Sequence, residues 1–281
     1  MPRKMRFPAW MLFAVCFLCY GIPAHAQATA SSKTELPSVD AILEKSITAT
    51  GGQEAWLKLT SMQIKAELTI DPPGLSGVLT MSSKAPDKES DCMVFAQGIF
   101  FCRAYDGNSG WQDDSRDGLK PLEGKDLEDM RRQADFYTEL HQKEHYSELK
   151  VLSEQDFDGL KVYVLAGTRK DGAKQELYFA KDSGLHVGTK DLSENEEDVK
   201  TTFYEDYKQT AGPGILIATK IRVVSTKMNM RMVIQEISPN IDLSDSMFVK
   251  PAKSGKDAAS TGSSGSSNRE NAAAKPYSHP Q

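Results

Sequence analysis

Residues 62–70 read MQIKAELTI, and this stretch decides the fold class. Apolar and polar side chains alternate strictly along it, which is typical of a β-strand with one face in a core and the other in water. The next four residues, Asp71-Pro72-Pro73-Gly74, predict a turn. The stretch therefore begins a sheet whose apolar side must be covered by other parts of the chain.

Short strands separated by turn signals continue this pattern along the chain. Dipeptides such as Asp158-Gly159, Asp171-Gly172 and Ser183-Gly184 are typical of hairpin turns. Short strands joined in this way predict an antiparallel sheet or an open barrel of about 10–11 strands. We expect the further strands near residues 77–84, 90–96, 99–105, 148–155, 160–168, 174–180, 184–192, 199–208, 214–225 and 230–238.

Helices are expected at three places. Apolar residues recur at helical spacing over residues 39–48, and Gly51-Gly52 gives the stop signal after them. A second, short helix is expected around Trp56. The longest is predicted over Lys125–Tyr146, as a lid on one face or mouth of the sheet. Its narrow apolar stripe consists of Leu127, Met130, Ala134, Tyr137 and Leu140.

The first 26 residues predict a secretory signal peptide. A basic start (Arg3, Lys4 and Arg6) precedes an apolar run over residues 7–20, and Ala24-His25-Ala26 fits a cleavage site after Ala26. The alternative, an uncleaved membrane anchor, is disfavoured because the apolar run is short for a membrane span. We therefore expect a periplasmic protein.

Composition divides the rest of the chain into three parts. Residues 27–36 are expected to form a flexible leader, and residues 37–251 one folded domain. Residues 252–281 are rich in Ser, Gly, Ala and Asn, which predicts a disordered low-complexity tail. The chain holds 34 Lys and Arg against 39 Asp and Glu, and the signal peptide takes three of the basic residues. This acidic balance argues against nucleic acid as a partner.

Two cysteines remain after the signal peptide, Cys92 and Cys102. The segment Ala96-Gln97-Gly98 between them is typical of a hairpin loop. Folding about Gln97 places the two cysteines opposite each other on neighbouring strands, and exported proteins meet an oxidising environment. We predict a Cys92–Cys102 disulfide. Two buried free thiols remain the alternative, because only a non-hydrogen-bonded pair brings the β-carbons close together.

Several short motifs, taken in order, resemble the outer-membrane lipoprotein-sorting proteins of the LolA/LolB-like superfamily over about residues 37–251. The resemblance implies a mainly β, α+β fold, a half-open antiparallel β-barrel with a helical lid. It also implies an apolar cavity for acyl chains or another lipid. We expect no cofactor. The motifs are structural turns, so they assign no ligand contacts. They are Gly51-Gly52-Gln53-Glu54-Ala55-Trp56, Leu59-Thr60-Ser61-Met62, Tyr178 to Leu185, Phe203-Tyr204-Glu205-Asp206-Tyr207, Ser238 to Asp242 and Met247 to Pro251.

A row of flexible apolar residues is the candidate ligand site. Met228, Met230, Met232 and Ile234 stand two apart, so in a strand they point to one side. Methionine adapts to varied apolar ligands, but it also fills ordinary cores, and both readings stay open. We expect the row to line the cavity together with inward residues of the first strand. Those residues are Ile64, Ala66 and Leu68.

One motif suggests chemistry. Residues 141–145 fit H-x-x-E-H, in which His141 and His145 on a helix could hold zinc beside Glu144 as a general base. Nothing in the sequence identifies a third ligand on a neighbouring helix. We interpret the two histidines as surface residues and expect no metal.

The resulting expectation is an exported, non-enzymatic protein that binds a lipid or a lipoprotein acyl chain, as a carrier does. A sensor or interaction protein of the envelope with the same fold is the alternative. A zinc hydrolase using His141, Glu144 and His145 is the remote one. The expected partners are a lipid or an acylated lipoprotein, and an inner- or outer-membrane protein.

Overall fold

The computed structural model describes residues 35–192 and 199–254 of the chain. The elements of secondary structure all belong to the compact unit that begins at Leu36. The predicted signal peptide, residues 1–26, and residues 255–281 of the predicted tail lie outside the described residues. No described helix combines the length and apolar character that crossing a membrane requires.

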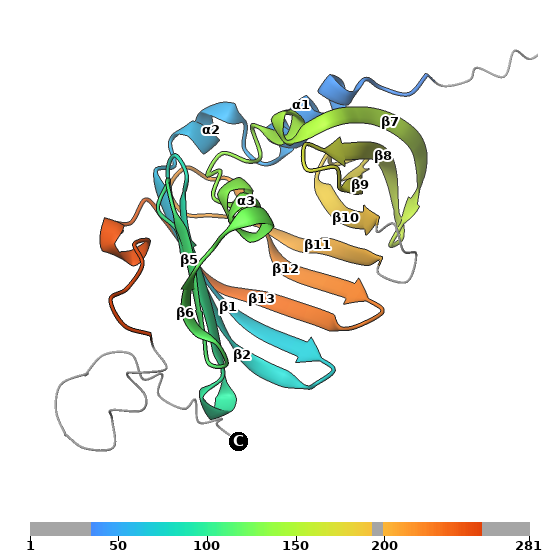
Figure 1. The fold of residues 1–281 in the computed structure, drawn as a ribbon. Coiled ribbons are helices and arrows are strands. Elements are labelled where there is room, and N and C mark those ends of the chain that lie inside the picture. The colour runs from blue at the N-terminus through green and yellow to red at the C-terminus, as the bar shows by residue number, and fades with distance from the viewer. Residues whose placement is uncertain (1–34, 193–198, 255–281) are drawn as a thin grey trace, which may run out of the picture. The chain divides into compact units, whose positions relative to one another are not determined.

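A single antiparallel sheet of 13 strands forms the body of this unit (Figure 1). Alternating strands with one polar face produce such a sheet because each apolar face packs inward. The strands are β1 (Ser61–Asp71), β2 (Leu75–Lys84), β3 (Lys88–Phe95), β4 (Phe100–Tyr105), β5 (Gly110–Asp114), β6 (Gly118–Pro121), β7 (Tyr146–Phe157), β8 (Leu160–Arg169), β9 (Lys174–Ala180), β10 (His186–Leu192), β11 (Lys200–Gln209), β12 (Leu216–Ser225) and β13 (Asn229–Pro239).

The strand order is β6-β5-β4-β3-β2-β1-β13-β12-β11-β10-β9-β8-β7. Two meanders therefore run outward from the central pair of β1 and β13, and the sheet ends at β6 on one side and at β7 on the other. It stays open, so the architecture is a half-open barrel. Two of the 13 strands, β5 and β6, were not expected. They are short and carry few of the β-branched and aromatic residues that mark strands in a sequence.

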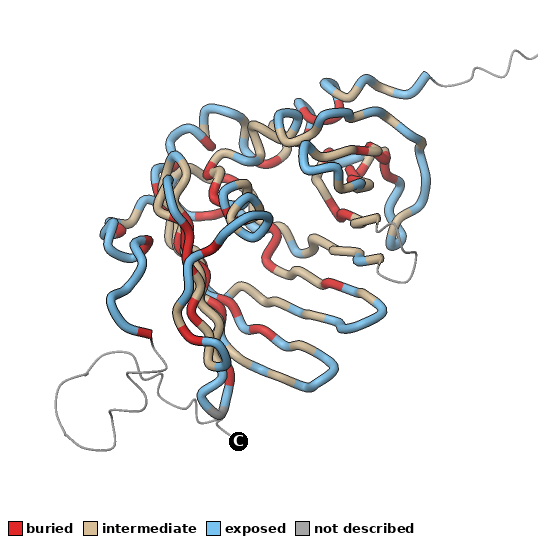
Figure 2. Tube along the Cα trace, viewed as in Figure 1, coloured by how far each residue is buried: buried red, intermediate tan, exposed pale blue. Residues whose placement is uncertain are grey.

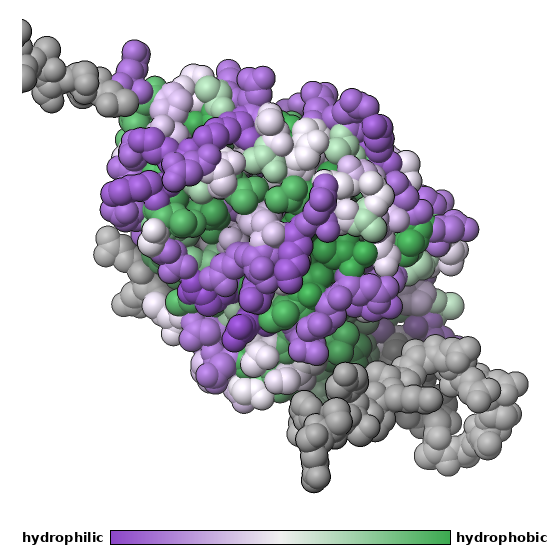
Figure 3. All heavy atoms as spheres, turned by 180° about the vertical axis from the view of Figure 1, so that it is seen from behind, coloured by the Kyte–Doolittle hydropathy of each residue, from purple (hydrophilic) through white to green (hydrophobic). Residues whose placement is uncertain are grey.

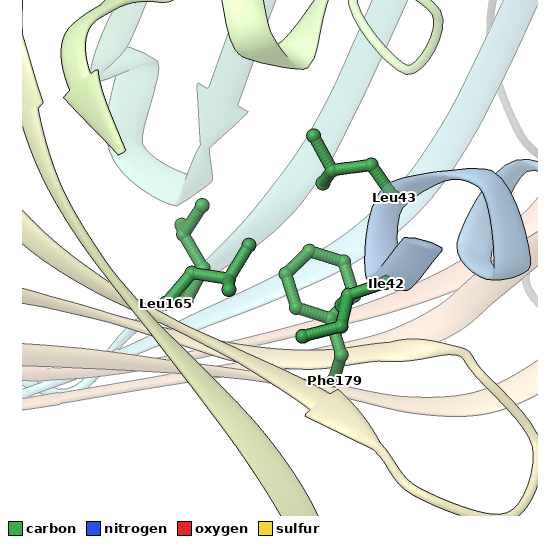
Figure 4. Packing of buried hydrophobic residues seen from close by; sticks show 5 residues of the cluster. Ile42, Leu43, Leu165 and Phe179 are labelled. Carbon is green, nitrogen blue, oxygen red and sulfur yellow. The ribbon is translucent and has the colours of Figure 1, made fainter. Parts of the chain in front are cut away.

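Helix α1 (Val39–Ala49) packs against one arm of the sheet. Ser38 caps it by accepting the N–H of Ala41 at 3.2 Å, and Gly51 and Gly52 follow it with positive φ angles of 117° and 84°. Its buried residues Ile42 and Leu43 contact β8 and β9 (Figure 4). Their partners there are Leu165, Leu177 and Phe179.

Helix α3 (Gly124–Gln133) lies on the link between the two edge strands, β6 and β7. It packs Met130 and Ala134 against Tyr105 of β4 and against Leu122. The connection between the edges therefore carries a helix over the inner face of the sheet, where Figure 1 shows α3 beside β5. We call this inner side, covered by α3, the concave face.

The predicted helix over Lys125–Tyr146 is wrong in length. Helix α3 ends at Gln133, and the chain then turns until η2 (Gln142–His145), a single 3₁₀ turn that precedes β7. Asp135 favours this break because its carboxylate accepts the N–H of Tyr137 at 3.2 Å, a bond that competes with helical pairing. The turn buries Phe136 with Leu59 and Ile215, and α2 (Gln53–Leu57) adds Trp56 to the same cluster.

The segment after β13 covers part of the outer face of the sheet. Phe248 is completely buried there, and its carbonyl oxygen accepts the indole N–H of Trp111 in β5 at 2.9 Å. Ser254, three residues beyond the expected end of the domain, donates its hydroxyl to Asp113. Figure 2 shows the resulting distribution, with buried residues along the strands and exposed ones at the hairpin tips.

The expected hairpin between Cys92 and Cys102 is confirmed. Cys92 of β3 lies directly opposite Cys102 of β4, and a disulfide joins them. The turn contains the 3₁₀ element η1 (Ala96–Gly98), closed by a hydrogen bond from the N–H of Phe95 to the carbonyl of Ile99 at 2.8 Å.

Candidate functional site

The pairing of β1 with β13 brings most of the predicted ligand residues onto one face. Directly paired residues of neighbouring strands point to the same side. The register sets Ile70 opposite Met230, Leu68 opposite Met232 and Ala66 opposite Ile234, while Ile64 lies opposite Ile237. A bulge between Lys65 and Ala66 absorbs one extra residue of β13 and keeps both ends of the row on that side. We call these residues the apolar row.

Burial differs along the apolar row. Ala66 and Leu68 are each 1% exposed and Ile64 is 8% exposed, whereas Met230, Met232 and Ile234 are only half-buried. Met228 does not join the row. It precedes β13 in a turn, is 43% exposed, and its carbonyl accepts the hydroxyl of Ser225 at 2.7 Å. The β13 side of the row is thus more accessible than the β1 side.

The same face continues across the sheet on both sides of the row. Met232 pairs with Ile221 of β12, and Ile221 pairs with Tyr204 of β11. In the other direction Ile64 pairs with Met81 of β2. Met81 pairs with Asp91 of β3, and Asp91 pairs with Arg103 of β4. The apolar row therefore forms the floor between two more polar walls.

A cavity of about 520 Å³ lies between these walls and α3. The helix contributes one side of the lining, β4 and β5 a second, and β8 to β11 a third. Its lining residues are Phe101, Arg103, Gln112, Leu122, Asp126, Asp129, Arg132, Gln133, Arg169, Gln175, Thr189, Asp191, Lys200, Thr202 and Tyr204. The cavity thus opens on the face that carries the apolar row, although its own lining is mostly polar.

Ion pairs connect the charged residues of this lining. The guanidinium of Arg132 contacts Asp129 at 2.6 Å, and Lys200 contacts Asp191 at 2.7 Å. Asp129 also faces Arg169 of β8 at 3.7 Å, which links α3 to the far wall. Arg169 in turn binds Asp171, and this hydrogen bond lowers the pKa of Asp171 to about 2. Burial raises the pKa of Tyr204 to about 12, so its hydroxyl stays protonated.

Two buried carboxyl groups, Glu89 and Asp91, lie on the wall formed by β3 and β4. Arg103 holds Asp91 at 3.1 Å and donates to Gln133 of α3 at 2.6 Å, while the other oxygen of Asp91, Oδ1, is buried without a donor among the described groups. Burial, together with the nearby charge of Asp91, raises the pKa of Glu89 well above its usual value.

A second, smaller cavity of about 390 Å³ lies between α1 and the segment before η2. Glu139 and Gln142 line it, and the amide of Gln142 donates to Glu139 at 2.8 Å. Burial raises the pKa of Glu139. The other wall carries Leu43 and Ile47 of α1 together with the acids Asp40 and Glu44.

The histidines of the H-x-x-E-H motif do not share a helix face. Residues 142–145 form the 3₁₀ turn η2, and both imidazoles instead contact Asp135, His141 at 3.0 Å and His145 at 3.1 Å. Burial alone would raise the pKa of Asp135, but the hydrogen bonds from His145 and His141 outweigh it, and the pKa is lowered. No group of three or more His, Cys, Asp or Glu side chains in the described part of the chain is arranged to hold a metal.

The polar lining residues are the part of the site that sequence reasoning missed. One usable signal is present in α3, where Asp126, Asp129 and Gln133 recur at helical spacing beside the apolar stripe of Leu127 and Met130. The lining residues of the strands give no such signal, because only the assembled sheet brings together residues from six separate strands.

The outer surface has a different character. Figure 3 shows one face of the molecule, on which several groups of hydrophobic side chains are separated by hydrophilic ones. Single exposed hydrophobic residues are normal on soluble domains. The concave face with its cavity therefore remains the stronger candidate for a binding site.

Comparisons with known proteins agree with this architecture. A family model described only as an uncharacterized protein matches residues 116–252. None of the curated proteins matches the sequence. A DUF1329 family protein from Desulfovibrio piger has the same fold with a TM-score of 0.56 and 17% identity, over 75% of this chain and 97% of that one.

Two further solved structures are similar. A LolA superfamily protein from Nitrosomonas europaea superposes with a TM-score of 0.53 at 16% identity, over 76% of this chain and 99% of that one. A domain from Vibrio parahaemolyticus is described as a putative outer membrane lipoprotein-sorting protein domain. It superposes with a TM-score of 0.51 at 13% identity, over 74% of this chain and 94% of that one. The resemblance to the LolA/LolB-like superfamily is therefore confirmed for the fold, a mainly β half-open barrel with helices over its concave face.

Proposed function

We propose that this protein is an exported, non-enzymatic carrier that holds a lipid, or the acyl chain of a lipoprotein, against the concave face of its sheet. The observation that carries the proposal is the apolar row of β1 and β13, which forms the floor beside the cavity under α3. An acyl chain needs a continuous apolar surface of this kind, because burial of each CH₂ group contributes about 0.8 kcal/mol.

The differing burial of the row supports a binding role for its β13 side. Leu68 and Ala66 are almost fully buried and belong to the core, whereas Met230 and Met232 keep accessible surface. Methionine side chains are flexible and polarizable, so they adapt to chains of different length. A ligand that enters beneath α3 can lie on them without unfolding the sheet.

The predicted signal peptide and the fold together support the periplasm as the place of action. The signal peptide of residues 1–26, with cleavage after Ala26, directs the mature chain to the periplasm. Lipid cargo there has to be shielded from water between two membranes. The Vibrio domain of the same fold is described as lipoprotein-sorting, which favours an acylated lipoprotein as one cargo and a membrane protein as the donor or acceptor.

A displacement assay with matched probes tests the proposal. The full mature protein is loaded with a hydrophobic fluorescent dye and titrated with an acylated lipoprotein peptide, or with the same peptide without its acyl chains. We expect the acylated peptide alone to displace the dye, and mass spectrometry to recover the ligand unchanged. Equal effects of the two peptides, or a chemically altered ligand, would contradict a carrier.

A further inference from the structure

The cavity under α3 is chemically unsuited to hydrocarbon alone. Of its lining residues, Phe101 and Leu122 are apolar, and the other thirteen carry polar or charged groups. Filling it with an acyl chain would remove those groups from water and supply no hydrogen-bonding partner in place of the water, which is costly. The part of a ligand that occupies this space should therefore bring its own polar groups.

The lining carries both signs of charge in nearly equal number. Its cations are Arg103, Arg132, Arg169 and Lys200, and its acids are Asp126, Asp129 and Asp191. A purely anionic group would meet three carboxylates, and a purely cationic one would meet four basic side chains. Electrostatic complementarity favours a group that itself carries both signs.

Some of these charges are free to take a ligand. Among the described residues, Asp126 is the one lining carboxylate for which the structure gives no ion-pair partner. Lys200 keeps half of its side chain exposed although it pairs with Asp191. The guanidinium of Arg132 contacts Asp129 through Nη2 and keeps further N–H donors. An ammonium can thus reach Asp126, and a phosphate can reach Arg132 and Lys200.

The polar cavity and the apolar row adjoin on one surface. Thr202 and Tyr204 line the cavity, and they pair with Val223 and Ile221 of β12. These two residues pair in turn with Met230 and Met232. A molecule whose polar end lies under α3 can therefore extend its apolar part directly onto the β13 side of the row.

We infer that the cavity takes the headgroup of a zwitterionic phospholipid, an ammonium joined to a phosphate, while the acyl chains of that lipid lie along the apolar row. This inference rests on the proposed function and specifies its ligand. Asp126 and Asp129 face the ammonium, and Arg132 and Lys200 face the phosphate. The sheet floor holds the chains.

A lipid-uptake experiment separates this inference from the proposed function. The full mature protein, freed of lipid, is incubated with vesicles that hold equal amounts of phosphatidylethanolamine, phosphatidylglycerol and diacylglycerol with identical acyl chains. After sedimentation of the vesicles, mass spectrometry counts the lipid left on the protein. We expect phosphatidylethanolamine to be enriched about fivefold over each of the others, the ratio that one partly exposed ion pair gives.

The other outcomes are equally clear. Uptake of all three lipids in the vesicle ratio would overturn the headgroup inference and leave the carrier proposal standing. Uptake of none would overturn both. Soluble phosphoethanolamine, added without vesicles, serves as a third arm. Binding of this compound as tight as that of the whole lipid would assign the cavity to a free polar ligand and overturn the lipid assignment.

Two variants with matched controls test which side chains bind the ammonium and the phosphate. Asp126→Asn should reduce the preference for phosphatidylethanolamine over phosphatidylglycerol to near unity, whereas Glu128→Gln, an exposed change on the same helix outside the cavity lining, should not. Lys200→Gln should weaken uptake of both phospholipids relative to diacylglycerol, and Lys190→Gln on β10, also outside the lining, is its control. Unchanged lipid ratios in both cavity variants, with folding verified by circular dichroism, would refute the inference.

Discussion

Leu68 of β1 lies directly opposite Met232 of β13, and the two side chains share the concave face of the sheet. Leu68 is 1% exposed, whereas Met232 keeps accessible surface. One pair of residues thus contains both a core position and an accessible one. The distinction can be measured, because a core residue affects the stability of the fold and a lining residue affects binding.

Leu68→Ala should lower the free energy of unfolding by roughly 2–5 kcal/mol, since the truncation leaves a cavity in a packed core. Met232→Ala should lower the free energy of unfolding clearly less, because the side chain of Met232 is already partly in contact with solvent. Urea denaturation followed by circular dichroism measures both. Equal losses in the two variants would place Met232 in the core and remove it from the binding surface.

Met230→Glu should lower the affinity for an acyl chain or hydrophobic dye at least roughly tenfold, because a bound chain would bury the new carboxylate without a partner. Arg231→Glu is the matched control, since this exposed neighbour lies on the opposite face of β13. Dye titration gives the affinities, and far-ultraviolet dichroism reports the fold. Binding that survives Met230→Glu unchanged would show that the row does not contact the ligand.

The Cys92–Cys102 disulfide joins residues ten positions apart, so it should stabilise the fold by about 2–3 kcal/mol. The intact mass should rise by two hydrogens on reduction, and reductant should lower the melting temperature. In the double variant Cys92→Ser/Cys102→Ser, reductant should have no further effect. Complete alkylation of both thiols in native, unreduced protein would disprove the bond.

Glu89 should make the fold less stable as the pH rises. Its pKa is raised in the folded state, so the folded protein retains a proton that the unfolded chain loses above the usual value of 4.5. The stabilisation is complete below that value and declines as the pH passes through the raised pKa. Glu89→Gln should remove this decline, and the exposed Glu128→Gln should keep it. Urea unfolding between pH 4 and pH 8 compares them, and parallel curves for wild type and Glu89→Gln would contradict the assignment.

His186 should act in the opposite direction. Its imidazole lies between the rings of Phe179 and Tyr204, and burial lowers its pKa from 6.5 to about 4. Between pH 6.5 and about pH 4 the unfolded chain therefore takes up a proton on His186 that the folded protein does not. The free energy of unfolding falls as the pH decreases through this range, by at most about 3 kcal/mol. In an NMR titration the imidazole of His186 should not shift above pH 5.5. A midpoint near 6.5 would show that the ring is in water.

The sequence predicted the parts of this structure that depend on neighbouring residues along the chain. The alternation in residues 62–70 and the loop at Ala96-Gln97-Gly98 are local patterns, and both the strand and the disulfide hairpin are present. The helix predicted over Lys125–Tyr146 failed because one side chain, that of Asp135, offers the backbone a competing bond that periodicity does not register.

The polar cavity could not be predicted for a different reason. Its lining comes from α3 and from six strands, so Arg103 and Lys200 come to line one cavity only after the whole sheet has assembled. The apolar row was easier to find, since it lies on two strands that each carry the pattern alone. Even there, the turn before β13 removed Met228 from the row, because turn boundaries depend on local hydrogen bonds such as those of Ser225.

The strand order also has a consequence for how the chain reaches this fold. Each meander consists of hairpins between consecutive strands and can form from local contacts. The pairing of β1 with β13 instead joins residues such as Lys65 and Glu236, which are 171 positions apart. Closing so long a loop costs conformational entropy before any contact of this pair has formed. Contacts between residues far apart in the sequence therefore slow folding. The centre of the sheet, which carries the proposed lipid surface, is therefore expected to close last.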